Sequence, residues 1–313
     1  MRYLLEIEPY NKFWGNCTTN MFLSILQKKH PSYEPLIYLN AYEYSRVDIF
    51  HINYTQQFYD YFNDIVLFEC CNFNNKKEFL SEFKKILISN SYVTINVDLF
   101  YWNKLGAYYN SMHKSHFSFV IGFDEEADII YALEDDINLT YAIREIPTDN
   151  FIKAFLSEYK DDSEDYRIIS IRDSEIKPYA LNKNDVLINA KRIISDIEDF
   201  IENENIINKD ILLSDVSNVY FYGNEFGKIS YRLLGNVLLF ETMRDNGMLD
   251  DMLTGELIAC INELSSKWKL VQNIFLKYCL SKKILDIDKI EKTIIDLFIK
   301  EKEMWLKLNV KIQ

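Results

Sequence analysis

The sequence predicts an α+β N-terminal domain followed by an all-α helical domain. Short apolar runs typical of strands dominate residues 1 to about 172, whereas the chain after about residue 180 has long stretches of helical period and hardly a β-rich run. Charge, Pro178 and a change of periodicity coincide between these two regions. We therefore divide the chain into residues 1–175 and residues 176–313.

The elements of the first domain follow from the spacing of apolar residues. A helix is predicted over residues 17–29, and a second, amphipathic helix over residues 76–88. Residues 33–67, which are rich in Tyr, Ile and Phe, are interpreted as irregular strands. A short helix is predicted at about residues 149–159. Further strand-like runs cover residues 92–99, 116–123, 129–134, 141–146 and 167–171.

The second domain is predicted to be an array of helices joined by turns. Short polar loops, such as Asp245-Asn246-Gly247, separate the helical stretches. No heptad seam is sustained along them, which leaves the oligomeric state open, with a homodimer as one option. The helical stretches cover residues 185–203, 216–246, 251–281 and 286–308.

The composition is that of a globular protein with ample material for a core. Hydrophobic residues make up 48% of the 313 residues and aromatic residues 15%, whereas disordered and collagen-like chains have the opposite bias. The formal net charge of −13 disfavours a general nucleic-acid binder, because a net anion repels phosphate backbones. The same charge is compatible with a cationic substrate such as an amine.

The cysteines, histidines and apolar runs bear on compartment and cofactors. Five cysteines, without a Cys-x-x-Cys pair, indicate a reducing compartment rather than a disulfide framework. The four histidines have no Cys neighbours at zinc-site spacings, so we expect no metal and no tightly bound cofactor. The N-terminal residues do not form a signal peptide, and no run approaches the roughly 18 apolar residues of a membrane span. We expect a cytoplasmic protein.

Cys17 is the first candidate for chemistry. It follows Gly15-Asn16 and opens the helix predicted over residues 17–29. The N-terminus of a helix presents free N–H groups and partial positive charge, which stabilise a thiolate and an oxyanion beside it. A lone Cys at such a position is more often a small buried residue, and that is the alternative when Cys17 is considered alone.

A predicted hairpin supplies partners for this thiol. His116 opens one apolar run and Asp135 follows the next. The start of one antiparallel strand lies near the end of the following strand, so these two side chains could meet at one end of the sheet. The acid would orient the imidazole, and the imidazole would deprotonate Cys17. Asp136 is an alternative acid and His113 an alternative base.

These residues resemble those of the family typified by the N-terminal domain of butirosin biosynthesis protein H. The resemblance covers about residues 10–172 and implies a papain-like fold with a Cys-His-Asp triad, followed by a helical domain. In size and in its Asn-, Ile- and Lys-rich composition, the chain is also similar to the amide-forming enzymes of closthioamide assembly. The matching stretches are residues 15–19 (Gly-Asn-Cys-Thr-Thr), 97–102 (Val-Asp-Leu-Phe-Tyr-Trp), 113–116, 120–126 and 133–136.

The resemblance implies an amide-forming acyltransferase of natural-product assembly. Cys17 would take an acyl or peptidyl group from the phosphopantetheine thioester of a carrier protein, with His116 as base and Asp135 as orienting acid. The acceptor would be a small amine, such as a diamine. We therefore expect a carrier protein and a small amine as partners, and neither nucleic acid nor membrane. A cytosolic cysteine peptidase or amidase with the same triad, and a non-catalytic scaffold, are the alternatives.

The resemblance also indicates candidates for the rest of the site. Papain-like enzymes use an amide side chain six residues before the Cys as an oxyanion donor, and Asn11 has that spacing here. Asn16 is the alternative, at a position where the family often has His. Each of these residues, and each candidate wall of the substrate pocket, has an ordinary turn or core residue as its alternative. The candidate pocket residues are Asp98, Trp102, Tyr108 and Tyr109.

Overall fold

Two compact units make up the chain. The first, which we call the sheet unit, combines Met1–Pro31 with Asp60–Lys177, and the second, the helical unit, combines Ser32–Tyr59 with Pro178–Gln313. The computed structural model describes residues 1–13, 17–29, 31–39, 43–46, 50–53, 66–90, 92–136, 140–161, 163–171, 179–202, 207–281 and 285–312.

The grouping of residues 32–59 differs from the predicted division at residue 175. α2 (Glu34–Tyr38) contacts α8, and the hairpin of β2 (Glu43–Arg46) and β3 (Phe50–Asn53) contacts α6 and α8. These partners are distant in sequence. The short elements therefore carry no local sign that they belong with the helices.

The helix α2 also corrects the prediction of strands from residue 33 onwards. Glu34 and Pro35 occupy its first turn, where a carboxylate is favourable and the missing N–H of proline costs nothing. The next three residues, Leu36, Ile37 and Tyr38, are buried. Burial of this short apolar run decided its conformation, because aromatic and aliphatic residues of this kind suit strands equally well.

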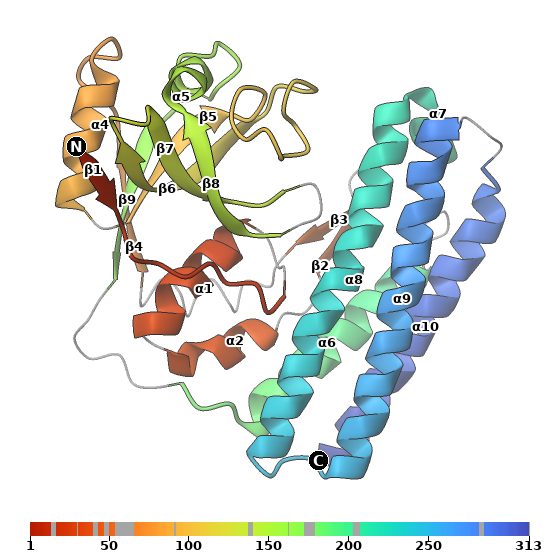
Figure 1. The fold of residues 1–313 in the computed structure, drawn as a ribbon. Helices are drawn as coiled ribbons and strands as arrows, with labels where there is room; N and C mark the ends of the chain where they lie inside the picture. The colour runs from red at the N-terminus through yellow and green to blue at the C-terminus, as the bar shows by residue number, and fades with distance from the viewer. Residues whose placement is uncertain are drawn as a thin grey trace. The chain divides into compact units, whose positions relative to one another are not determined.

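An antiparallel sheet forms the centre of the sheet unit (Figure 1). Its strands pair in the order β4-β9-β5-β6-β7-β8, and β1 lies beside the last residues of β6. β1 has no counterpart among the predicted strands. The ends of β6 and β7, which form a hairpin, lie within one residue of the bounds predicted for these two strands. The strands are β1 (Arg2–Leu4), β4 (Val66–Cys71), β5 (Val93–Asp98), β6 (Ser115–Asp124), β7 (Ile129–Glu134), β8 (Ala142–Pro147) and β9 (Tyr166–Ile171).

Helices cover both faces of this sheet. All six residues of β5 are buried, which requires a cover on each side. α4 (Phe79–Ser89) and α5 (Thr148–Phe155) pack on one face, against the core that includes Val93, Ile95 and Val97. α1 (Cys17–Lys29) lies on the opposite side of the sheet from α5. There the rings of Phe22 in α1 and Phe68 in β4 are 5.6 Å apart, centroid to centroid.

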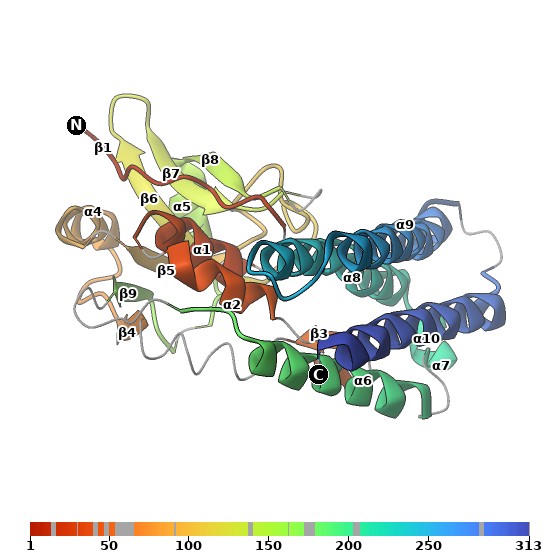
Figure 2. The same ribbon diagram turned by 90° about the horizontal axis from the view of Figure 1, so that it is seen from below.

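Long helices build the helical unit (Figure 2). α8 packs along α9, and α10 contacts both α6 and α9. Gly223 and Gly227 of α8 allow a close approach, because a Cβ at either position would lie within 3 Å of a side chain of α9. The helices are α6 (Lys183–Glu202), α7 (Lys209–Ser214), α8 (Val216–Asp245), α9 (Asp251–Ser281) and α10 (Ile287–Ile312).

The described residues thus form a mixed α/β structure with an antiparallel sheet and a C-terminal helical region, as the sequence predicts at that level. Among the helices that the structure describes, none has the length and apolar character of a membrane span.

Glu301 is a buried carboxyl in the core of the helical unit. Its side chain on α10 is fully buried, and neither carboxyl oxygen has a hydrogen-bond partner in the part of the chain that the structure describes. Burial disfavours the charged form and raises the pKa of Glu301 to about 8. The folded protein therefore holds a neutral carboxylic acid at this position at neutral pH.

Glu301→Gln should remove part of the pH dependence of stability. Between the pKa of the unfolded chain, about 4.3, and the folded value of about 8, the folded state binds one more proton than the unfolded state. The free energy of unfolding therefore falls as pH rises through this window, by up to about 1.4 kcal/mol per pH unit. Urea unfolding at pH 5, 6, 7 and 8 should show a shallower decline for Glu301→Gln than for the wild type.

Glu303→Gln is the matched control, because Glu303 is exposed on the same helix. Its stability should follow that of the wild type at every pH. Parallel curves for the wild type and Glu301→Gln would contradict the raised pKa of Glu301.

Candidate active site

Cys17 is the first residue of α1, as the sequence predicts. The helix is fastened to the segment before it by a buried amide: Asn20 Nδ2 donates to the carbonyl oxygens of Tyr10 and Phe13, at 3.0 Å each. The backbone N–H of Tyr10 donates to Ser24 Oγ at 2.9 Å. These buried hydrogen bonds hold the chain that leads into the helix, and so fix where the Cys17 side chain emerges.

The hairpin of β6 and β7 carries the predicted partners. Phe119 pairs with Leu133, which places His116 near the beginning of β6 and Asp135 just after the end of β7. Both therefore lie at the same end of the sheet, as expected for an antiparallel pair. Asp124 Oδ1 accepts hydrogen bonds from the backbone N–H groups of Glu126 and Ala127, and these bonds close the tight turn between the two strands.

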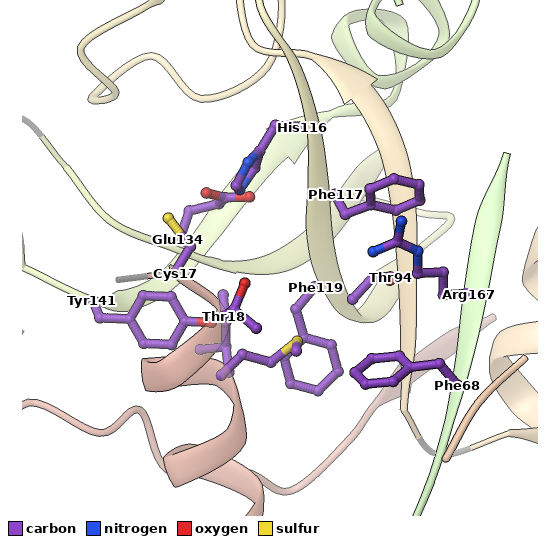
Figure 3. A pocket seen from close by; sticks show the side chains of 12 residues that line it. Cys17, Thr18, Phe68, Thr94, His116, Phe117, Phe119, Glu134, Tyr141 and Arg167 are labelled. Carbon is purple, nitrogen blue, oxygen red and sulfur yellow. The ribbon is translucent and has the colours of Figure 1, made fainter. Parts of the chain in front are cut away.

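A small cavity of about 60 Å³ brings Cys17 and His116 together (Figure 3). Glu134 and Tyr141 line it beside them, and both belong to the same end of the sheet. His116 is partly buried in this lining. The structure thus places the predicted nucleophile and the predicted base at one cavity.

Asp135 contacts the thiol directly. The Cys17 S–H donates to Asp135 Oδ2, with 3.7 Å between the sulfur and the oxygen. In the predicted arrangement the imidazole would stand between the thiol and the acid. Among the described residues, no hydrogen bond joins His116 to Asp135 or to Cys17. The linear order of a resting triad is therefore replaced by a cluster in which the acid touches the sulfur.

Asp136, the alternative acid, is held elsewhere. Its Oδ2 accepts from Arg144 Nη2 at 3.1 Å, and its Oδ1 accepts the backbone N–H of Thr140 at 3.0 Å. This ion pair and turn contact fasten the loop between β7 and β8. Of the two adjacent acids, Asp135 is the one at the thiol.

Burial and acidic neighbours keep the thiol protonated. Burial raises the pKa of Cys17 well above its ordinary value, and the carboxylates of Asp135 and Glu134 raise it further. Burial also lowers the pKa of His116 to about 4, an effect to which the positive charge of Lys114 adds. At neutral pH the site therefore holds a neutral thiol and a neutral imidazole, not the thiolate that a helix N-terminus alone favours.

Glu134 is a further ionisable group of the site. Its side chain is 4% exposed, and Oε1 accepts from Trp102 Nε1 at 3.0 Å. Burial, together with the negative charge of Asp135, raises the pKa of Glu134 to about 8. The run Glu134-Asp135-Asp136 is the sequence signal for it, but three consecutive acids do not reveal which one turns inward.

Of the two candidate oxyanion donors, Asn11 and Asn16, the structure describes only Asn11. Asn11 is used in binding the loop before β8: its Nδ2 donates to Tyr141 O at 2.5 Å, and its Oδ1 accepts the backbone N–H of Tyr141 at 3.0 Å. This pair brings Tyr141 beside Cys17 in the cavity lining. Asn16 lies outside the described residues.

The four predicted pocket residues do not line the described Cys17 cavity. Trp102 is fully buried in the core, and Asp98 is fully buried at the end of β5. Tyr108 Oη accepts from Lys114 Nζ at 3.1 Å, and Tyr109 lines a separate groove of about 800 Å³. The pocket prediction is therefore wrong for this cavity, because aromatic content alone does not say which face of the sheet a side chain occupies.

His113, the alternative base, belongs to a cluster around Asp98. Its Nδ1 is 2.6 Å from Asp98 Oδ2, which also accepts from Ser157 Oγ at 2.6 Å. The ring is stacked between Phe100 and Tyr159, with ring centroids 4.3 and 3.9 Å away. His113 is not part of the described lining of the Cys17 cavity.

Sequence reasoning missed several residues of the cavity. Phe68, Thr94, Phe117 and Arg167 line it, on strands β4, β5, β6 and β9. Strand register brings them together, and no motif in the sequence marks them. Among the described residues, no group of three or more His, Cys, Asp or Glu side chains is arranged as a metal site.

A scan of protein-family models gives no match to this chain, and a search of curated proteins gives none either. The resemblance to the butirosin-type family therefore stays a prediction from the quoted stretches of sequence. The function has to be inferred from the site itself.

Asp135→Asn should make Cys17 more reactive towards alkylation. Removing the carboxylate charge 3.7 Å from the sulfur lowers the pKa of the thiol, so more thiolate is present at a given pH. We expect iodoacetamide to alkylate Cys17 about tenfold faster at pH 8 in this variant. Peptide mass spectrometry would measure the rate at Cys17 specifically.

Asp136→Asn is the matched control, since the carboxylate of Asp136 is paired with Arg144. Its alkylation rate should stay within about twofold of the wild type. An unchanged or slower rate in Asp135→Asn would show that Asp135 does not control the protonation of the thiol.

Proposed function

We propose that this protein is an amide-forming acyltransferase whose sheet unit has a papain-like fold. The observation that carries the proposal is the Cys17 thiol at the amino end of α1, in a small cavity that the His116 imidazole also lines. A Cys at a helix N-terminus, packed on an antiparallel sheet that carries a His, is the arrangement that the sequence resemblance implies. Its chain order, Cys then His then Asp, supports the same assignment.

The first step would transfer an acyl group to Cys17. The sulfur attacks the carbonyl carbon of a phosphopantetheine thioester on a carrier protein, and the thiol proton passes to His116. The bond between that carbon and the pantetheine sulfur then breaks, and His116 returns the proton to the leaving sulfur. The products are a Cys17 thioester and a free pantetheine thiol. Asp135 would stabilise the imidazolium that forms in between.

The second step would transfer the acyl group from Cys17 to an amine. The neutral nitrogen attacks the carbonyl carbon, and its extra proton passes to His116. The bond to Cys17 breaks, and the thiol regains a proton from the imidazolium. One amide bond forms and the enzyme returns to its starting state without consuming water.

Two features of the site support an amine as the acceptor. The carboxylate of Asp135, 3.7 Å from the sulfur, makes the wall beside the thiol acidic, which attracts an ammonium ion. A small diamine suits this wall, because one nitrogen can react while the other stays charged. The amine must lose its proton before it attacks, and a carboxylate next to the sulfur is placed to accept it.

The size of the cavity favours transfer over proteolysis. A peptidase binds an extended chain in an open groove, whereas the Cys17 cavity holds only about 60 Å³. An acyl group would itself fill most of so small a cavity and displace water from the thioester, so it survives until an amine arrives. A peptidase or amidase, and a non-catalytic scaffold, remain the competing functions that the experiment separates.

Incubation with an acyl-phosphopantetheine thioester should add the mass of the acyl group to the wild type but not to Cys17→Ala. Intact-protein mass spectrometry would follow the adduct, first with thioesters of free pantetheine and then with carrier-bound donors. Adding a small amine or diamine should remove the adduct and yield the corresponding amide. Cys71→Ala, which removes a cysteine of β4, is the control and should be acylated like the wild type.

Loss of the adduct at the same rate in buffer alone would contradict the transferase and indicate a hydrolase. Absence of an adduct with every carrier-bound donor would contradict both enzymes and leave the scaffold.

The rate of acylation should stay high well below neutral pH. His116 accepts a proton only in its neutral form, and its lowered pKa of about 4 keeps it neutral at pH 5 and above. The profile of kcat/KM against pH should therefore fall on the acid side near pH 4, rather than near the ordinary value of about 6.5. Stopped-flow acylation assays would measure it, with circular dichroism to establish that the fold persists.

His116→Gln should lose this acid limb and reduce acylation by roughly 100-fold or more. An acid limb between pH 6 and 7 would contradict the buried environment of His116, and an unchanged rate in His116→Gln would exclude it as the base.

A further inference from the structure

One row of side chains crosses the sheet on the face that α1 covers. Arg167 of β9 pairs with Thr94 of β5, Thr94 pairs with Phe119 of β6, and Phe119 pairs with Leu133 of β7. Directly opposed residues of neighbouring strands share a face, so these four side chains lie in a line. All four line the cavity that contains Cys17.

The hydroxyl of Thr94 is unsatisfied in this row. The residue is 3% exposed, and in the part of the chain that the structure describes its Oγ1 has no hydrogen-bond partner. A buried hydroxyl without a partner is costly, so the polar group of Thr94 needs a reason. Because Thr94 lines the cavity, an occupant of the cavity can supply the missing partner.

Arg167 provides further donors beside Thr94. Its guanidinium carbon lies 3.7 Å from the centroid of the Phe117 ring, which fixes the plane of the group. Nε donates to Glu164 Oε2 at 3.0 Å, and Nη2 donates to Glu164 Oε1. This pairing neutralises the charge of Arg167 and uses two of its five N–H groups. The group therefore offers hydrogen-bond donors rather than a net positive charge.

Thr94 and Arg167 lie at the end of the lining away from the thiol. Figure 3 shows Cys17, Glu134 and Tyr141 at one end, and Thr94 and Arg167 at the other. Met21, Phe119 and Leu133 are apolar members of the lining, and Thr18 is a further polar one. The cavity thus has a reactive end, a mostly apolar part and a polar end that contains the unsatisfied Thr94 hydroxyl.

We propose that the acyl groups accepted by Cys17 are short and carry a hydrogen-bond acceptor, such as a ketone or amide carbonyl, that binds Thr94 and Arg167. This inference rests on the proposed acyl transfer and specifies its donor. The length follows from the cavity of about 60 Å³, because one water-sized group needs roughly 10–15 Å³. About four to six such groups fit. A plain hydrocarbon chain would leave the Thr94 hydroxyl buried without a partner, and is disfavoured.

An anionic end group is also disfavoured. Glu164 already occupies the charged face of Arg167, and its pKa, lowered to about 2 by the hydrogen bonds from Arg167, keeps it ionised at all ordinary pH values. A carboxylate on the acyl chain would have to displace Glu164 or lie beside it. A neutral hydrogen-bond acceptor on the acyl chain neither competes with Glu164 for Arg167 nor is repelled by its charge.

Two donors of matched shape test the inference. Levulinyl and isocaproyl pantetheine thioesters differ in one position, where a ketone oxygen of the first is a methyl group in the second. We expect the wild type to be acylated about tenfold faster by the levulinyl donor. Thr94→Val should remove most of this preference by slowing the levulinyl reaction, and Thr94→Ser, which retains a hydroxyl, should keep it.

Thr94→Val should fold well, because it exchanges an unsatisfied buried hydroxyl for a methyl group of equal size. Its melting temperature should equal or exceed that of the wild type. Thr254→Val is the matched control: Thr254 is as buried as Thr94 but lies on α9, and its hydroxyl donates to Asp250 O. The donor preference of this control should be unchanged.

The outcomes separate the inference from the function on which it rests. Equal rates with the two donors, unaffected by Thr94→Val, would overturn the inference and leave acyl transfer intact. A second measurement uses Cys17→Ala and calorimetric binding of the two donors with a non-reactive methylene-ketone linkage in place of the thioester. Selective binding of the levulinyl analogue that depends on Thr94, without any acylation of the wild type, would support the polar end and overturn the proposed transferase. The absence of both acylation and selective binding would overturn the inference and the proposed transferase together.

Discussion

A sheet with two buried faces is the constraint on which the site depends. β5 is buried along its whole length, so helices must cover it on both sides. α4 and α5 supply the cover on one face, and α1 supplies it on the other, where Phe22 meets Phe68. The amide of Asn20 then binds the chain that precedes α1. Together these contacts bring the first residue of α1, Cys17, to the end of the sheet where β6 begins and β7 ends.

The same burial sets the protonation of the site. Removal of water favours the neutral form of each group, so the thiol of Cys17, the carboxyl of Glu134 and the imidazole of His116 are all held uncharged. A thiolate beside two carboxyl groups would be costly, and the resting cysteine is consequently a poor nucleophile. In the proposed mechanism the proton leaves the sulfur only when an acyl carbonyl is in place. That coupling protects the thiol from wasteful reactions while the site is empty.

The polar residues in the sheet row extend this reasoning to the substrate. A core chosen for packing alone would have an apolar residue at position 94, as it has at Phe119 and Leu133. A local departure from that rule in an otherwise well-packed unit is expected where a protein binds something. The fully buried Glu301 of the helical unit departs from the same rule. Thr94 in addition lines the cavity that contains Cys17, and it is this cavity that makes its buried hydroxyl evidence for a ligand.

The local elements around the site could be predicted from the sequence. The helix over residues 17–29 and the hairpin containing His116 have nearly the predicted bounds, because apolar period and turn residues act over a few neighbours. Which faces of these elements meet depends on contacts between distant parts of the chain and could not be predicted. Strand pairing placed Thr94 and Arg167 in one cavity, kept Trp102 in the core and put Asp135, not Asp136, at the thiol. Residues 32–59 joined the helical unit for the same reason. The periodicity of apolar residues shows that a strand has an apolar face. What that face touches is decided by pairing between segments far apart in sequence, which depends on shape and burial.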